Sequence, residues 1–364
     1  MLKVSALAAL VFVPVLASAQ HVASTTASVI DVPARIALLK STQAPLLRSA
    51  IDSLHSCVAT PVVTPPTGPM QIPHHYLSGS HGPTNPEEKK QTEVYGAFER
   101  RTTAGMNQYL ATGSHAEAQC ALDQMDAWAN AHTLMDYDPH VNQNTQSWFQ
   151  VEWTLSSLGT TLSVLVNDKD LDPAKLKRVI KWLDASAHKM IGFEGPKDNN
   201  NHHDWRALAA ISIGVVAKDN SLFDYGAGVY KEAVAQIDTS GAFPLEMARH
   251  ERAIHYQSFA LQPLLMIAEF GEQQHIDLYA YEKNGRTLRD AVRFLGHAMD
   301  DPTIVKTYTD DAQMIDFAGS DFAPFVFYAA RFGNGDLGST ITNGLKKPVF
   351  ETRIGGSTTV MAAK

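Results

Sequence analysis

Residues 199–205 read NNNHHDW and lead directly into the apolar stretch RALAAISIGVVA. A single Asn or Asp is enough to cap the start of a helix, so this run carries more hydrogen-bonding groups than a helix start requires. The surplus amides and imidazoles indicate a functional site at this boundary. Asn201 and His202 are its first candidate residues.

A second polar group lies within LEMARHERAIHYQSFALQPLLMIAEF, where Arg249, Arg252 and Tyr256 are spaced i, i+3 and i+7. On a continuous α-helix these three residues share one face. A lone Tyr on such a face is usually a core residue, but a core face rarely tolerates unpaired guanidinium groups. We therefore expect the positive charge to depress the pKa of the Tyr256 phenol, which could then act as base and then as acid.

His250, Glu251 and His255 look at first like the helix of a zinc protease. That motif needs histidines at i and i+4, whereas His255 follows His250 at i+5, and the two imidazoles would diverge by about 140° around a helix. No other cluster has metal-ligand spacing. The sequence therefore predicts no metal and no cofactor.

Amide, imidazole, guanidinium and phenol groups together fit the chemistry of a uronic acid inside a polysaccharide. Its C5 proton, next to the carboxylate, is very weakly acidic while that carboxylate stays anionic. Removing that proton requires donors that neutralise the carboxylate, a base for the proton, and an acid for the departing glycosidic oxygen at C4. The predicted reaction is a β-elimination that leaves a 4,5-unsaturated uronyl end.

The elements that must position these residues are helical. Apolar residues recur with helical spacing over 34–55, with a break or kink at Pro45. Further helical stretches are 87–111, 115–131, 145–167, 173–190, 204–217, 220–237, 247–271 and 286–299. Clear strand alternation is absent before the Gly- and Thr-rich C-terminal tail. We predict an all-α fold of helical hairpins wrapped into a bundle or toroid.

Residues 59–86 differ in composition, being dense in Pro, Gly, Ser and His. The segment holds too many breakers for regular structure, and it is long enough to suggest a lid. A disordered surface loop is the alternative. Basic and aromatic residues in and near it would complement a polyanion: Tyr76, Lys89, Lys90, Arg100 and Arg101.

The first 19 residues have the pattern of a secretory signal peptide, with Lys3, an apolar core and a small-residue cleavage site near Ala19. Residues 20–364 are then expected to form one mature domain in the periplasm or outside the cell. In an oxidising compartment the two cysteines, Cys57 and Cys120, are more readily a disulfide than two free thiols.

The formal net charge is −8, from 30 Lys and Arg against 38 Asp and Glu. This balance argues against nucleic acid or an anionic membrane as partner, since both favour a broad positive surface. An anionic polysaccharide can still bind if the acidic body contains a local basic cleft. We expect a soluble monomer.

Several of these residues resemble the signature segments of the family 5 polysaccharide lyases, the mannuronate-type alginate lyases. The resemblance is specific over 199–270, in NNH followed by Trp205, in PLEMAR, and in RAIHY leading into FALQPLLMIAEF. QSWFQVEW, which begins at Gln146, and the positions of the two cysteines are also similar. The resemblance implies a secreted or periplasmic bacterial enzyme built on an incomplete (α/α) toroid.

It also implies roles for individual residues. Asn201 and Arg249 would neutralise the substrate carboxylate, and Tyr256 would transfer the proton. With mannuronate Tyr256 would be both base and acid, whereas with the C5 epimer His202 would be the base. The substrate-binding residues implied by the resemblance and the polar patterns are Tyr76, Arg100, Gln146, Trp205 and Arg252.

Three positions depart from the family pattern, since Asp204 replaces an aromatic residue, His250 a Gly and Gln257 a His. They make polyglucuronate or another polyuronide an alternative to polymannuronate. A glycoside hydrolase is a second alternative, with Glu246 and either Asp198 or Asp204 as its carboxylates. A non-catalytic polysaccharide-binding protein is the third.

Overall fold

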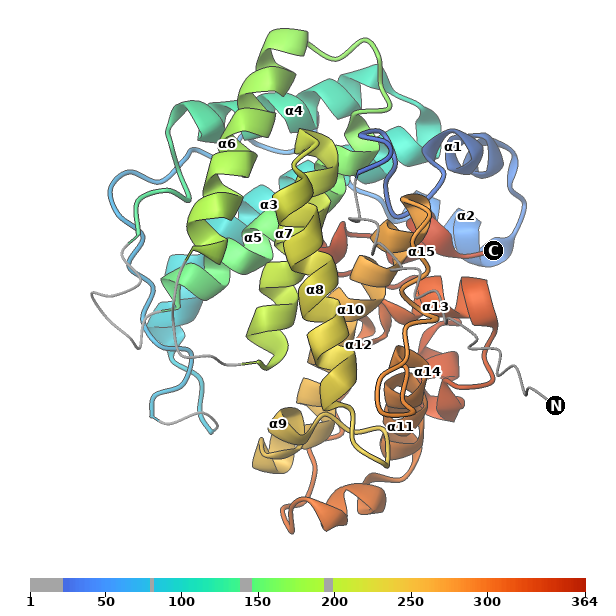
Figure 1. Ribbon diagram of the computed structural model, residues 1–364. Helices are drawn as coiled ribbons and strands as arrows, with labels where there is room; N and C mark the ends of the chain where they lie inside the picture. Colours follow the sequence, from blue (N-terminus) through green and yellow to red (C-terminus); the bar gives the residue numbers. More distant parts are fainter. Residues whose placement is uncertain (1–21, 79–81, 138–145, 193–198) are drawn as a thin grey trace, which may run out of the picture.

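The computed structural model describes residues 22–78, 82–137, 146–192 and 199–364 of the chain (Figure 1). The predicted signal peptide lies outside the described residues.

The described chain is helical, which confirms the predicted all-α fold. The longer helices are α1 (Val32–Ser41), α2 (Pro45–Asp52), α3 (Pro86–Thr112), α4 (His115–Asn130), α5 (Ser147–Leu165), α6 (Pro173–Ile191), α7 (Asn201–Ala217), α8 (Asn220–Gln236), α10 (Ala253–Gln273), α11 (Leu288–Asp300) and α13 (Phe325–Phe332). Shorter elements are α9 (Pro244–Met247), α12 (Gly319–Phe322), α14 (Gly338–Gly344), α15 (Thr358–Ala362) and the 3₁₀ turns η1 (His250–Arg252), η2 (Pro302–Thr307) and η3 (Thr352–Ile354).

β-structure in the described residues is limited to isolated bridges, and the C-terminal tail forms short helices instead of a strand. Within the same residues, no helix is both long and apolar enough to cross a membrane.

Helix starts follow the capping chemistry of the sequence. The side chains of Asp31, Asn85, Asp172, Asn200 and Asp219 each accept a hydrogen bond from a backbone N–H in the first turn of the helix that follows. Because Asn200 is the cap of α7, this helix begins three residues earlier than the predicted start at residue 204. Asn201 and His202 therefore lie in its first turn, where backbone N–H groups point outward.

The predicted helix over 247–271 is wrong at its beginning. The chain forms α9, turns through η1, and only then enters α10 at Ala253. The interruption falls at His250, whose φ of 54° is left-handed and cannot continue an α-helix. Arg249, Arg252 and Tyr256 are therefore not on one continuous helical face.

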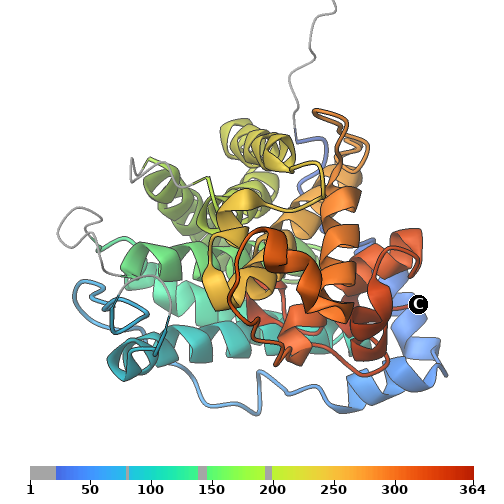
Figure 2. The ribbon, with the colours of Figure 1, turned by 90° about the horizontal axis from the view of Figure 1, so that it is seen from below.

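The middle of the molecule is formed by α5, α7 and α10. Every residue of α5 except Phe149 is buried, and α7 packs against α5, α8 and α10. Figure 1 shows these helices layered across the body, and Figure 2, seen from below, shows the later helices (orange to red) gathered beside the earlier ones (cyan to green). Because α7 and α10 are buried on most sides, their sequences RALAAISIGVVA and FALQPLLMIAEF are largely apolar.

The chain ends come together at one side of the body. α15 packs against α2 and α3, so the last described segment lies beside the first ones (Figure 2). Arg35 of α1 fixes this contact by donating to the carbonyl oxygens of Thr359, Val360 and Ala363 at 2.6 to 3.0 Å.

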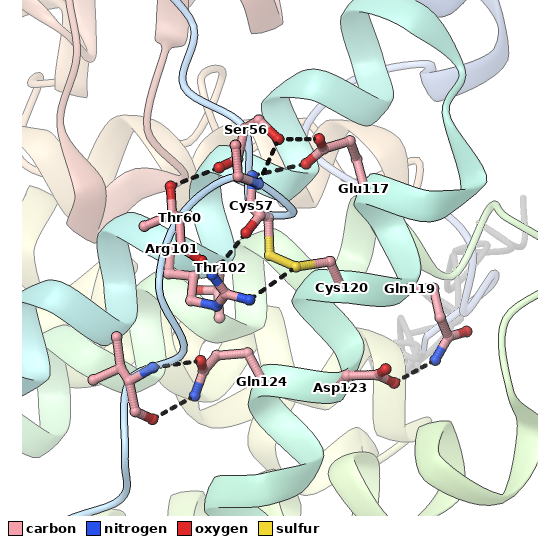
Figure 3. The surroundings of a disulfide bond; sticks show 12 residues. Ser56, Cys57, Thr60, Arg101, Thr102, Glu117, Gln119, Cys120, Asp123 and Gln124 are labelled. Carbon is pink, nitrogen blue, oxygen red and sulfur yellow. Dashed lines mark hydrogen bonds between the residues drawn. A yellow bond between two sulfur atoms is a disulfide. The ribbon is translucent and has the colours of Figure 1, made fainter.

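Cys57 and Cys120 form the predicted disulfide, with their Cα atoms 6.0 Å apart (Figure 3). Arg101 of α3 donates Nη1 to the carbonyl oxygens of Cys57, at 2.7 Å, and of Thr60, and Nη2 to Cys120 Sγ at 3.2 Å. Glu117 of α4 accepts from the Cys57 N–H at 2.8 Å. The disulfide and these polar contacts tie the start of the Pro-rich segment to α3 and α4.

The first part of the segment 59–86 is anchored. Both the N–H and the carbonyl of Val63 bond to the amide of Gln124. Further along, Ile72 N–H donates to Ser147 Oγ at 3.0 Å, and Gln146 N–H donates to the Ile72 carbonyl at 2.8 Å. The segment is thus held against α4 and α5 as far as Ile72.

Beyond Ile72 the chain folds back on itself. Leu77 N–H donates to the Pro83 carbonyl at 3.0 Å, and Asn85 N–H donates to the His75 carbonyl at 2.7 Å. Tyr76 lies in this turn, opposite Thr84. The backbone hydrogen bonds of this turn run within the predicted lid itself. A lid function stays a prediction.

Candidate active site

Asn201 is the first residue of α7 and is completely buried. Its backbone N–H donates to Glu246 Oε1 at 2.7 Å, and its Nδ2 lies 3.1 and 3.0 Å from the two carboxylate oxygens of Glu246. Glu246 belongs to α9, so this contact joins the NNNHHDW segment to the PLEMAR segment. Burial raises the pKa of Glu246 to about 7, although the hydrogen bonds from Asn201 oppose the shift.

His202 stands next to Asn201 on α7. The ring of Phe149 is stacked on its imidazole, with centroids 3.4 Å apart and planes 17° apart. On another side its Nδ1 faces Glu152 Oε2 at 3.5 Å, while Glu152 Oε1 accepts from Arg206 Nε at 2.9 Å. The stacked Phe149 ring therefore restrains the tilt of the imidazole, and Glu152 lies beside its Nδ1 atom.

Arg249 and Tyr256 meet in spite of the broken helix. The guanidinium carbon of Arg249 lies 3.7 Å from the centroid of the Tyr256 ring. The Tyr256 hydroxyl is hydrogen-bonded to the Tyr76 hydroxyl at 2.7 Å, and the Arg252 guanidinium lies 5.4 Å from the Tyr76 ring. The structure thus brings four of the predicted residues together: Tyr76, Arg249, Arg252 and Tyr256.

The expectation of a depressed Tyr256 pKa is wrong for this conformation. Burial raises the pKa of the phenol above its usual range, and this effect outweighs the lowering by Arg249 and Arg252. The Tyr76 side chain contributes to the rise, because its hydroxyl is hydrogen-bonded to the Tyr256 phenol. The phenol is therefore protonated while Tyr76 is in place.

Further cationic and aromatic side chains surround these residues. The Arg353 guanidinium lies 4.4 Å from the Trp153 ring and 5.6 Å from the Phe259 ring. His255, whose pKa is lowered mainly by burial, packs edge-on against the Tyr256 ring. Arginines, imidazoles and aromatic rings are the groups that bind anionic sugars, through charge and through stacking.

Two predicted substrate-binding residues are buried. Trp205 has no exposed surface, and its ring packs 5.2 Å from that of Phe259, so it supports the site from beneath. Gln146 is 6% exposed and caps α5 beside Ile72. In this conformation neither residue presents a surface to a polymer, because both are packed into the body.

Arg100 is not brought to the other candidates. It is exposed on α3, ion-paired with Glu93 at 2.5 Å. It lines a separate cavity of about 320 Å³ together with His55 and the C-terminal residues 348–350. The structure therefore gives no support to substrate binding by Arg100 at the Tyr256 site.

The three departures from the family pattern do not line the site. Asp204 is buried near Glu246, and burial together with that carboxylate raises its pKa well above the usual value. Gln257 is buried and holds the turn before α9, bonding to the Phe243 N–H and the Gly241 carbonyl. His250 is exposed and pairs with Asp311. Its left-handed φ explains why a Gly is typical at that position.

Sequence reasoning missed Phe149, Glu152 and Arg353. A signal existed for Glu152, because an acidic residue in the apolar run WFQVEW must find a partner once its helix is buried. Arg353 gave no signal, because it follows the last predicted helix by more than 50 residues.

One group of side chains among the described residues has its ligand atoms close enough together to hold a metal ion. It consists of Asp184, His188 and Asp219, at the end of α6 and the cap of α8. His188 is already hydrogen-bonded to Asp219 at 2.8 Å. None of the site residues belongs to this group.

The body is all-α, and its site combines an imidazole, an amide, a phenol and several arginines. These features define a polysaccharide lyase. The groups that neutralise a carboxylate and those that move the neighbouring proton come from separate helices. The sequence profile of the alginate lyase family matches residues 42–305. The chain belongs to this family.

The similarity to known proteins extends over 60% to 94% of this chain in the relatives described next. Alginate lyase A1-III from Sphingomonas species A1 is 38% identical, with a TM-score of 0.87 over 94% of this chain and 97% of that chain, which confirms the predicted (α/α) toroid. Two variants of that enzyme, a His to Ala and a Tyr to Phe exchange, are complexed with tetrasaccharide and have TM-scores of 0.89. A polysaccharide lyase of Stenotrophomonas maltophilia is 28% identical over 91% of this chain and 97% of its own. An alginate lyase of Pseudomonas aeruginosa is 31% identical over 60% of each chain.

Proposed function

We propose that this protein cleaves alginate, within poly-β-D-mannuronate, by β-elimination. The observation that carries the proposal is the meeting of Arg249 and Tyr256 at 3.7 Å, with Arg249 also interacting with Glu246, the carboxylate that binds Asn201 at the start of α7. The family relationship and the tetrasaccharide complexes of the A1-III variants support an anionic polysaccharide as substrate.

The C5 carboxylate is neutralised by His202 and Arg249, and by Asn201 once substrate entry exposes its amide, which is completely buried in this conformation. Backbone N–H groups at the start of α7 add positive potential in the same region, because the N-terminal end of a helix favours anions. Neutralisation makes the C5 proton more acidic, since negative charge can then move into the carboxylate as the proton leaves.

Tyr256 then moves the proton. As a phenolate it takes the C5 proton, the C5–H electron pair forms the C4–C5 double bond, and the C4–O4 bond breaks. The same phenol gives its proton to the departing O4, so the enzyme ends in its starting state and no water enters the bond. In mannuronate the C5 proton and O4 lie on the same side, which is why one residue can serve both steps.

Displacement of Tyr76 removes one cause of the raised Tyr256 pKa. Burial is the largest cause that raises the pKa of the phenol, and the bond to Tyr76 adds to it. When Tyr76 moves away, Arg249 and Arg252 remain as neighbours that stabilise the phenolate. Substrate entry that moves Tyr76 away therefore favours the phenolate, while burial continues to oppose it.

A hydrolase mechanism is disfavoured by the carboxylates. Glu246 is hydrogen-bonded to the Asn201 amide, and its carboxylate lies close enough to Asp204 to raise the pKa of that group, so the two carboxyl groups are neighbours. Hydrolysis needs two carboxyl groups facing the bond from opposite sides. Asp198, the remaining candidate, lies outside the described residues.

We propose further that the protein is exported after cleavage near Ala19 and acts as a monomer. The leader pattern of the sequence and the disulfide support export, since disulfides persist in oxidising compartments. The proposed reaction uses only groups that one copy of the chain holds together, so it requires no residue from a second copy.

Ultraviolet absorbance tests the proposal, because only elimination forms a double bond conjugated with the carboxylate. The mature protein is incubated with polymannuronate, polyguluronate, polyglucuronate and pectate, with Tyr256→Phe as the matched control. We expect the fastest increase on polymannuronate. Release of reducing ends without absorbance would show hydrolysis, and binding without either product would show a non-catalytic protein.

A further inference from the structure

The two residues that open α7 are each held from behind by a buried glutamate. Glu246 comes from α9 and contacts Asn201, and Glu152 comes from α5 and contacts His202. Their exposed fractions are 1% and 0%. Because they come from different elements, the arrangement does not follow from the geometry of any one helix.

Glu246 fixes the amide of Asn201. Only the Nδ2 side of an amide can face a carboxylate, so the contacts of 3.1 and 3.0 Å exclude the flipped amide. Both contacts use the same amide nitrogen, so Glu246 sets the direction in which the Asn201 amide faces. Glu246 also accepts the backbone N–H of Asn201, which holds the whole residue at the helix end.

Glu152 fixes the imidazole of His202. Its Oε1 is used by Arg206, and within the described part of the chain its Oε2 makes no hydrogen bond and faces His202 Nδ1 at 3.5 Å. A carboxylate at Nδ1 holds a proton there and turns Nε2 the other way. The stacked Phe149 ring sets the plane in which this happens.

Burying two carboxylates is unfavourable for folding. Burial raises the pKa of Glu152 to about 8 and that of Glu246 to about 7, which measures how poorly their charges are solvated. Residues with apolar side chains of similar size would pack in these places without that penalty. The burial of two ionisable carboxyl groups therefore calls for an explanation outside stability.

We propose that Glu246 and Glu152 are positioning residues of the lyase reaction, each acting through its own partner on α7. The inference rests on the proposed function. Glu246 presents the Asn201 amide to the substrate carboxylate, and Glu152 presents Nε2 of His202. Neither glutamate touches the substrate.

Double-mutant cycles on kcat/KM with polymannuronate test the pairing. Glu246→Gln and Glu152→Gln are each combined with Asn201→Ala and with His202→Ala. Each glutamate variant alone is expected to lose about tenfold or more, the equivalent of one charged hydrogen bond. When Asn201 is already replaced by Ala, Glu246→Gln should lower kcat/KM by less than about twofold further. Glu152→Gln should have an equally small further effect when His202 is already replaced by Ala. In the two crossed combinations the losses should multiply.

A purely structural role would give equal losses in both backgrounds, and that result would overturn the inference. If a variant falls below detection, the same cycles are measured on oligouronate affinity in a Tyr256→Phe background, with the same pairing expected. Glu269→Gln is the matched control, since Glu269 is a buried glutamate paired with Arg331 away from the site, and it should lower the melting temperature without changing kcat.

Failure to fold is handled by a second set of variants. Glu246→Asp and Glu152→Asp keep the charge but withdraw it by one methylene, so intermediate losses with the same pairing are expected. Wild-type protein that is inactive on every polyuronate would refute the proposed function. Active wild-type protein whose losses multiply in all four combinations would refute the positioning roles alone.

Discussion

Replacing Tyr256 by Phe removes one oxygen atom and leaves the ring in place. In the folded protein that oxygen makes one described hydrogen bond, at 2.7 Å to the Tyr76 hydroxyl, so the free energy of unfolding should fall by about 1 kcal/mol. The Arg249 contact at 3.7 Å is with the ring face and should persist. The variant should therefore fold and bind substrate normally.

The chemical step should nearly disappear. General acid and base catalysis contribute about 10² to 10⁴ in rate, and one oxygen that serves in both roles should reach the upper end. A loss of about 10⁴ corresponds to about 5.4 kcal/mol of transition-state stabilisation. Because the variant also loses the contact between Tyr256 and Tyr76, the substrate meets less competition and KM should not rise.

The assay is initial rate of ultraviolet absorbance on polymannuronate, with a melting curve and oligouronate affinity for the same preparation. A variant that keeps more than about a tenth of the parental kcat loses less than the weakest typical acid or base effect. Tyr256 would then be a packing residue, and the proton-transfer mechanism would be wrong.

Four other outcomes are expected. His202→Ala should abolish activity on polyguluronate, where it is the base, and reduce it less on polymannuronate, as the same absorbance assay will measure. Because burial raises the pKa of Glu246 to about 7 and that of Asp204 well above its usual value, the folded state holds protons that the unfolded state has lost. The free energy of unfolding should therefore fall as pH rises from about 4 to 7, and Asp204→Asn should flatten this dependence in melting curves. Reducing the Cys57–Cys120 bond, which spans 63 residues, should lower the free energy of unfolding by about 4 kcal/mol in denaturant titrations. Turnover should persist after dialysis against a chelator, and restoration by calcium of an activity lost there would contradict neutralisation by protein groups alone.

Local interactions were predictable from the sequence. Capping of α7 by an Asn follows from residue types alone, since the cap and the N–H groups it binds are neighbours in the chain. The excess of polar groups in NNNHHDW has a structural counterpart, because Asn201 is hydrogen-bonded to the buried Glu246 and His202 faces the buried Glu152. A catalytic role for these two residues stays a prediction.

Contacts between distant segments were not predictable in the same way. The apolar residues keep helical spacing from Met247 to Phe270, and this spacing does not predict the left-handed conformation of His250. Arg249 nevertheless packs against the Tyr256 ring. The two residues are in contact as expected, but through the turn between α9 and α10 and not along one continuous helix. Trp205 and His202 are three residues apart on α7, and only the packing of α5 and α10 decides that the first is buried and the second is not.

The Tyr76 and Tyr256 hydrogen bond makes part of the chain a competitor of its own substrate. The chain is anchored on both sides of Tyr76, by the hydrogen bond from Ile72 to Ser147 of α5 and by the start of α3 at Pro86. The Tyr76 hydroxyl therefore meets the Tyr256 hydroxyl at high effective concentration. Apparent affinity is reduced by the fraction of molecules in which the contact is formed. A single uronate gains few contacts with which to displace it, whereas a polymer also reaches the arginines and aromatic rings around the site. Under the proposed mechanism the tether therefore favours polymers over single uronates, independently of which uronate they contain.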